Sequence, residues 1–149
     1  MIFDKFHIIT TLVTMFVVII AVLSHYEGLR YFTSWMASTR LRPRLRIVLM
    51  IYGLLLLHTL EIWLFGVSYW ALSGEPDYGM ITGETDIATL VDYVYFSATV
   101  YSTLGFGDLL PSGPIRLIVG IESVTGLLLI TWSESFTYLE MIQYWRKDR

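Results

Sequence analysis

A glycine-containing segment in the last third of the chain has the residue types needed to draw a cation out of water. Its six residues are, in order, Thr103, Leu104, Gly105, Phe106, Gly107 and Asp108. Backbone carbonyls can replace the hydration shell of an ion when four such segments line one axis and turn successive C=O groups inward. That geometry requires φ > 0, which glycine adopts at no steric cost. The segment therefore indicates cation coordination, although two glycines near an aspartate also occur in loops without such a role.

The composition of the chain places this segment in a membrane. Of the 149 residues, 55% are apolar and only 15% are charged, and the mean hydropathy is +0.61. That profile is typical of proteins that lie in lipid. The chain has no cysteine, which excludes disulfides and thiolate metal sites, and its length indicates a single domain.

Three apolar segments are long enough to cross a bilayer as helices. The first lies within residues 1–29, the second spans 47–72 and the third spans 115–142. We expect the first helix to pack against the outer face of the second. It carries no regular series of arginines, so it is not expected to sense voltage.

A fourth, shorter helix is expected over residues 88–102, with Asp86 as its N-cap. At about 1.5 Å per residue, this helix reaches only half-way across the hydrocarbon. It must therefore enter the membrane and stop, and a re-entrant segment of this kind is tolerated only when it is buried in protein or lines water. The loop before it, residues 73–85, is interrupted by glycine and proline, so we expect no regular structure there.

The distribution of charge predicts the topology. Five arginines fall in the loop of residues 30–46, namely Arg30, Arg40, Arg42, Arg44 and Arg46, and the tail of residues 143–149 is also basic. Because short basic loops stay on the cytoplasmic side, we expect the loop and the C-terminus inside and the N-terminus outside. The predicted location is the plasma membrane, which is the inner membrane in a bacterium.

The clustered arginines admit two interpretations. Arg40, Arg42, Arg44 and Arg46 either mark topology alone or bind the headgroups of anionic lipids. No base-reading groups accompany them, so nucleic-acid binding is not expected.

Three ionisable residues fall inside the predicted helices. His58 and Glu61 lie one turn apart and share a face of the second helix, and Glu122 lies at a similar depth on the third. We expect a buried polar layer behind the short helix, with Glu122 either hydrogen-bonded to Ser97, Thr99 or His58, or acting as a pH-sensitive strut. A His-x-x-Glu pair also occurs in metal sites, but we find no matching second histidine on a neighbouring segment, and we expect no metal there.

The third helix carries a polar stripe at i, i+3, i+4 and i+7 spacing, formed by Thr131, Glu134, Ser135 and Tyr138. That spacing places all four on one helix face, which we expect to line an ion pathway. Glu122 is about 180° away around the helix and should face the protein interior.

The predicted order of elements resembles the pore domain of potassium channels, in its bacterial two-transmembrane form, over about residues 45–142. That order is a helix, a re-entrant helix, the glycine segment and a second long helix. Besides 103–108, the residues that carry the resemblance are Tyr95, Phe96, Ser97, Gly126, Leu127, Leu128, Leu129, Trp132 and Ser133. Phe106 departs from the family pattern, where a tyrosine is commoner.

The resemblance implies a role for each matched position. K⁺ would bind the carbonyls of Thr103, Leu104, Gly105 and Phe106, and Gly107 would complete the selectivity filter. Asp108 would support the filter from behind. Gly126 would be the hinge of the inner helix, although it would equally suit close helix packing.

The expected fold class is an all-α membrane protein with three transmembrane helices, a re-entrant pore helix and a selectivity-filter loop. One chain supplies one filter strand and coordination needs four, so we expect a homotetramer around a four-fold axis. The chain is predicted to divide into an additional N-terminal helix (1–29), a basic loop (30–46), a pore domain (47–142) and a basic tail (143–149). Within the pore domain we expect an outer helix (47–72), a pore helix (88–102), a filter (103–108) and an inner helix (115–142).

The expected function is passive, selective conduction of K⁺, the permeant ion, with no organic cofactor and no chemical step. A non-selective cation channel is one alternative, if packing around Phe106 is loose, and a non-conducting subunit of a hetero-oligomer is another. An intramembrane enzyme built on His58, Glu61 and Glu122 would lack a recognisable nucleophile–base pair. The sequence shows no cytoplasmic ligand-binding domain, so we expect gating to arise within the membrane or from a partner.

Overall fold

Three long helices lie alongside one another in the computed structural model, which describes residues 4–83, 87 and 89–147. They are α1 (Lys5–Ser38), α2 (Pro43–Leu72) and α4 (Arg116–Lys147). Each contains a segment long and apolar enough to cross a membrane. The sequence-based prediction of three such helices is confirmed.

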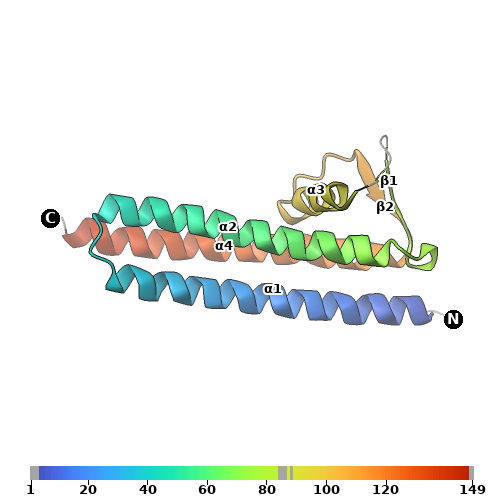
Figure 1. Ribbon diagram of the computed structural model, residues 1–149, viewed down its shortest axis with the longest axis horizontal. Coiled ribbons are helices and arrows are strands. Elements are labelled where there is room, and N and C mark those ends of the chain that lie inside the picture. Colours follow the sequence, from blue (N-terminus) through green and yellow to red (C-terminus); the bar gives the residue numbers. More distant parts are fainter. Residues whose placement is uncertain (1–3, 84–86, 88, 148–149) are drawn as a thin grey trace.

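The long helices form a layer with a smaller unit on one side (Figure 1). Helices α2 and α4 are in contact, and α1 packs against both of them along one side. The expected contact between α1 and α2 is therefore present, and the contact with α4 is additional. The short helix α3 (Leu90–Tyr101) packs against α2 and α4 on the other side, toward one end of the molecule.

Helix α1 continues nine residues beyond its predicted end, through the first part of the expected loop. Its last residue is Ser38, and the chain then turns extended at Thr39, whose N–H bonds to the Trp35 carbonyl at 3.1 Å. Pro43 begins α2 because its fixed φ fits the first helical turn and disfavours helix in the preceding residue. Residues 30–38 contain no glycine or proline, and Met36 is buried with Met50 of α2. The predicted loop over 30–46 was thus wrong for residues 30–38 and 43–46.

Helix α3 starts two residues later than predicted. Its N-cap is Thr89, whose N–H bonds to the Asp92 carboxylate at 2.8 Å in a reciprocal capping box. The predicted cap, Asp86, lies outside the described residues. With 12 residues, α3 is about 18 Å long and too short to cross a bilayer.

The loop before α3 contains regular structure that the sequence analysis did not expect. Strand β1 (Ile81–Gly83) pairs antiparallel with β2 (Leu109–Pro111), Ile81 opposite Pro111 and Gly83 opposite Leu109. Two short 3₁₀ turns, Pro76–Tyr78 and Gly113–Ile115, flank the pair. Gly79 makes the close approach possible, because its φ is +98° and a Cβ there would lie 1.9 Å from the Ser112 carbonyl oxygen.

The two ends of the molecule differ in what they carry. The β1–β2 pair and the N-terminal end of α1 lie at one end, whereas the α1–α2 connection and the C-terminal end of α4 lie at the other (Figure 1). The arginine-rich connection and the basic tail therefore share an end, as the predicted topology requires.

Candidate functional site

The segment of residues 103–108 leaves the C-terminal end of α3 through a hydrogen-bonded turn. The N–H of Thr103 donates to the Val100 carbonyl at 3.0 Å, and that of Gly105 donates to the Thr99 carbonyl at 3.1 Å. Thr103, Gly105 and Gly107 have φ values of 58°, 52° and 82°. Every second residue of the segment is therefore left-handed, and both glycines have the positive φ expected from the sequence.

This alternation is a backbone geometry by which consecutive carbonyls can face one side, as ion coordination requires. A Cβ on Gly105 or Gly107 would meet no described atom within 4 Å. Glycine is thus needed at these positions for its backbone freedom and not for space. Thr103 has no such freedom, and a non-glycine residue in the left-handed region is a form of strain that is concentrated at functional sites.

Asp108 is held by a side chain from α3. The Tyr95 hydroxyl donates a hydrogen bond to Asp108 Oδ2 at 2.9 Å. This bond to the carboxylate raises the pKa of Tyr95 above its ordinary value. The contact ties the end of the 103–108 segment to the middle of α3, which is a geometry suited to the support role predicted for Asp108.

Gly126 lies where α4 packs against the end of α3. A Cβ on Gly126 would lie 2.2 Å from the carbonyl oxygen of Tyr101 and 2.9 Å from its carbonyl carbon. Close helix packing, which was one of the two interpretations made from the sequence, therefore accounts for the glycine at this position. The hinge role stays a prediction.

The predicted polar stripe of α4 lies on an exposed face of the single chain. Thr131, Glu134, Ser135 and Tyr138 are all exposed, whereas Glu122 on the opposite face is fully buried. Glu134 and Tyr138 line a groove of about 600 Å³ between α2, α3 and α4, and Thr131 and Ser135 do not. The stripe is thus open to water or to a neighbouring molecule, with two members turned toward α2.

A family model described as "Ion channel" matches residues 48–138, more than half of the chain. The match includes α3, the 103–108 segment and most of α2 and α4. The chain belongs to the ion-channel family. The matched residues are those over which the sequence resembles a channel pore domain.

A relative of this chain is found in Bacillus subtilis (strain 168), under the name "Uncharacterized membrane protein YdjJ". It is 42% identical over 87 residues, which are 56% of this chain and 26% of the relative. The chain thus spans about a quarter of the length of that protein. No solved structure matches the chain significantly. Family and helices together make this an integral, multi-pass membrane protein.

The predicted polar layer of the channel is two separate clusters. In the first, buried Glu122 accepts hydrogen bonds from the Ser97 hydroxyl, at 2.5 Å, and from the Tyr69 hydroxyl. Ser97 was one of the three partners predicted. Thr99 bonds instead to the backbone of its own helix, and His58 belongs to the second cluster. Glu122 thereby joins α4 to α2 and α3.

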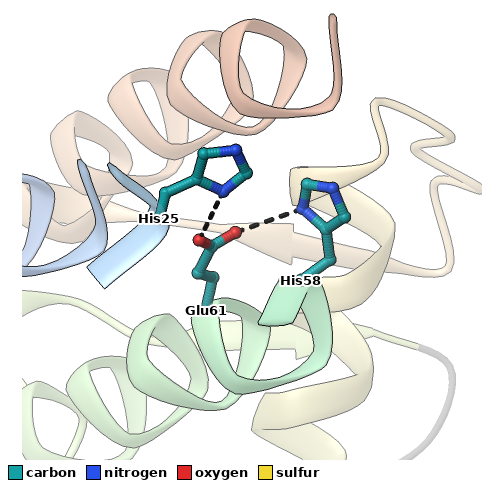
Figure 2. Close-up of side chains that lie close together, drawn as sticks. All are labelled: His25, His58 and Glu61. Atoms are coloured by element: carbon teal, nitrogen blue, oxygen red, sulfur yellow. Dashed lines mark hydrogen bonds and ion pairs between the residues drawn. The ribbon is translucent and has the colours of Figure 1, made fainter. Parts of the chain in front are cut away.

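The second group, which we name the histidine–glutamate cluster, contains His25, His58, Glu61, Tyr101 and Ser133. His25 Nδ1 lies 2.8 Å from Glu61 Oε1, and His58 Nδ1 lies 3.2 Å from Glu61 Oε2 (Figure 2). The Tyr101 hydroxyl donates to Glu61 and lies 2.9 Å from His58 Nδ1. Ser133 Oγ lies 3.0 Å from His58 Nε2 and 3.3 Å from His25 Nε2. One cluster thus connects α1, α2, α3 and α4.

The sequence analysis missed His25, and its statement that no second histidine matches His58 and Glu61 was wrong. His25 continues a stripe of buried α1 residues, Thr14, Val17 and Ala21, at spacings of three or four. A histidine on the buried face of a membrane helix must find a polar partner. That spacing was the signal from which its position could have been inferred.

The arginines lie at the end of the channel away from β1 and β2. Arg40, Arg42 and Arg44 are exposed, and Arg46 is partly buried. They occupy the short α1–α2 connection and the first turn of α2. Helix α4 continues into the predicted tail to Lys147, and residues 148–149 lie outside the described residues.

Proposed function

We propose that four copies of this channel surround one axis and conduct K⁺ passively and selectively. The observation that carries this proposal is the alternating left-handed backbone at Thr103, Gly105 and Gly107. Carbonyls arranged in that way by four chains can exchange, oxygen for oxygen, with the hydration shell of K⁺. In this reading the carbonyls of residues 103–106 hold the ions, Gly107 completes the filter and Asp108 supports it.

Helix α3 has a length that supports its proposed role as a pore helix. It ends at Tyr101, two residues before the filter begins, so the negative end of its dipole faces the place where an ion would lose its water. Its packing on α2 and α4 would cover a re-entrant segment with protein, as the bilayer demands.

The exposed apolar surface of the single chain supports a tetramer. Leu104 is 64% exposed and Phe106 is 66% exposed. Next to the polar stripe, α4 also exposes Val124, Leu127 and Leu128. Neighbouring copies around a four-fold axis would cover these residues and would bring four filter segments together.

A tetramer of this kind would also give a role to the polar stripe of α4, to the two termini and to the clustered arginines. Thr131, Glu134, Ser135 and Tyr138 would line the pore on the cytoplasmic side of the filter. The N-terminus would lie outside and the C-terminus in the cytoplasm of the cell, with the channel in the plasma membrane. The arginines at 40, 42, 44 and 46 would meet the inner leaflet, where anionic headgroups bind basic side chains.

Reconstitution into vesicles tests the proposal directly. We expect K⁺ flux far above Na⁺ flux, and a cross-linked species of four chains. Equal K⁺ and Na⁺ fluxes would make the protein a non-selective cation channel instead. A folded, inserted protein without flux of either ion would contradict conduction by the homomer and would favour a subunit of a hetero-oligomer.

A further inference from the structure

The histidine–glutamate cluster brings three metal-ligating side chains from two helices to one point. The ligand atoms of His25, His58 and Glu61 all lie within 4.8 Å of one another. His25 and Glu61 are essentially inaccessible, at 0% and 1% exposure, and His58 is exposed by 15%. Figure 2 shows both imidazole rings directed at the Glu61 carboxylate, one from α1 and one from α2.

The donor set has the chemistry of a zinc site. Two imidazole nitrogens and one carboxylate are common ligands of Zn²⁺, which they bind at about 2.0–2.2 Å in tetrahedral geometry. Neighbouring ligand atoms in such a tetrahedron are about 3.3 Å apart. The Glu61 oxygens lie 2.8 Å from His25 Nδ1 and 3.2 Å from His58 Nδ1, and all the ligand atoms lie within 4.8 Å of one another, so they would adjust to tetrahedral separations as an ion enters. Mg²⁺ and Ca²⁺ prefer oxygen donors alone and do not suit this set.

Tyr101 is placed to be the fourth ligand. Its hydroxyl bonds to Glu61 and lies 2.9 Å from His58 Nδ1, the atom that would ligate the ion. The Tyr101 oxygen would thus complete a four-ligand set from the end of α3.

Ser133 orients both imidazole rings for this role. Its hydroxyl oxygen lies within hydrogen-bonding distance of both Nε2 atoms. With an ion bound, each Nε2 would keep an N–H that donates to Ser133, and each Nδ1 lone pair would ligate the ion in place of its hydrogen bond to Glu61. Ligating histidines in metal sites are typically held in this manner by a hydrogen bond at the other ring nitrogen. Protons shared with the carboxylate occupy the same region, and an ion would displace them.

An entry route leads to the cluster from the protein surface. The groove of about 600 Å³ between α2, α3 and α4 is lined by His58, Tyr101 and Ser133. An ion in the groove would therefore meet three members of the cluster before it reached the fully buried pair.

We propose that His25, His58 and Glu61 bind a divalent transition-metal ion of the Zn²⁺ type, with Tyr101 as the fourth ligand. The ion fastens α1 to α2 and to the end of α3, two residues before Thr103. The additional N-terminal helix thereby gains a metal-dependent attachment to the domain that carries the filter segment.

Metal content and affinity test the site without any measurement of ion flux. Protein stripped with a chelator and purified in detergent is titrated with ZnCl₂ in excess Mg²⁺, and bound zinc is measured by elemental analysis and calorimetry. We expect one Zn²⁺ per chain. His25→Gln and His58→Gln should each weaken binding by about 100-fold or more, since each removes a ligand. His7→Gln is the matched control, because His7 is an exposed α1 histidine outside the cluster, and it should bind as the wild type does.

Co²⁺ provides a measurement on the unmutated channel. Co²⁺ bound in place of zinc should give the visible absorption of a tetrahedral nitrogen–oxygen site, which excess Zn²⁺ removes. Equal zinc content in the wild type and in folded His25→Gln protein would overturn the proposal. So would wild-type protein that gives only the weak spectrum of octahedral Co²⁺.

Discussion

Thr103, Gly105 and Gly107 share one backbone conformation but not its energetic cost. All three have positive φ, which costs an L-residue with a side chain roughly 1–2 kcal/mol and glycine nothing. Of these three residues only Thr103 therefore carries this strain, and in the proposed pore its hydroxyl would add an oxygen for an ion that is still partly hydrated. The two glycines keep the rest of the segment unstrained.

Replacing Gly105 with alanine should abolish K⁺ flux. The added Cβ meets no described atom, so the effect would come from φ alone, at roughly 1–2 kcal/mol per chain and four times over in a tetramer. Gly120→Ala is the matched control, because Gly120 lies in α4 without positive φ and its Cβ would also meet no described atom. Vesicle flux measures both variants. Normal K⁺ flux through Gly105→Ala, at normal insertion, would refute the filter assignment.

The Tyr95–Asp108 bond should contribute measurably to stability. Tyr95→Phe removes it at almost constant shape, and since the bond is exposed we expect a small but measurable loss of stability. A double-mutant cycle with Asp108→Asn, read by denaturant unfolding, isolates the coupling. Because the pKa of Tyr95 is raised in the folded state, the contribution is complete below the ordinary tyrosine pKa of about 10 and is lost as the pH rises through the folded-state value. Additive single-mutant effects at pH 7 would argue against any support role for this bond.

At the scale of elements, packing decides the role of Gly126. If the only role of Gly126 is to make α4 flexible, replacing it with alanine should stabilise the protein by about 0.5–1 kcal/mol, because alanine has the higher helix propensity. Because a Cβ would lie 2.2 Å from the Tyr101 carbonyl oxygen, we expect the opposite sign, a loss of about 1–3 kcal/mol from overpacking. Thermal unfolding in detergent measures the change, with Gly120→Ala as a helix control that should be neutral or stabilising. A stabilised Gly126→Ala channel would favour the hinge.

The elements show which parts of the structure a sequence can predict. The long helices, the short α3 and the positive φ of Gly105 and Gly107 follow from apolar length and residue type. The β1–β2 pair does not, because three-residue strands give no readable period and their pairing joins segments on opposite sides of α3. The end of α1 was also misjudged, since arginines near a membrane mark the cytoplasmic side and not the end of a helix.

In the candidate sites, too, some features follow from local spacing in the sequence and others depend on tertiary packing. Local spacing placed Thr131, Glu134, Ser135 and Tyr138 on one exposed face and Glu122 on the opposite, buried one. Hydrogen-bond partners that come from helices distant in the sequence could not be predicted from local spacing. Tyr69 for Glu122 and His25 for Glu61 are supplied by tertiary packing, and only the buried stripe of α1 hinted at the second.

At the scale of the whole molecule, four-fold symmetry would repeat every charge four times. Glu134 is exposed at the groove beside α2, and four copies would form a ring of carboxylates in the inner pore. Two charges 10 Å apart repel by about 0.4 kcal/mol in water and about 1.7 kcal/mol at an effective dielectric constant of 20. Such a ring should favour an open inner end, and it should concentrate K⁺ and attract divalent cations from the cytoplasm.

Glu134→Ala should therefore lower outward K⁺ current and weaken block by cytoplasmic Mg²⁺. Single-channel recording with and without Mg²⁺ measures both effects. Glu27→Ala is the control, because Glu27 is exposed on α1, 3.4 Å from Arg30, and it should change neither. If conductance, block and open probability are all unaltered in Glu134→Ala, the residue does not line the pore.

The β1–β2 pair has a consequence for how such an assembly is built. Its register joins Ile81 to Pro111, so α3 and residues 103–108 lie inside a closed loop of about 30 residues. Closing a flexible loop of this length costs roughly 3 kcal/mol in chain entropy, and here the closure is made within one chain. In the proposed tetramer, each protomer would accordingly shape its own strand of residues 103–108 before it met its neighbours. Assembly would then join four finished strands, and its rate would depend on encounters between protomers and not on the folding of this segment.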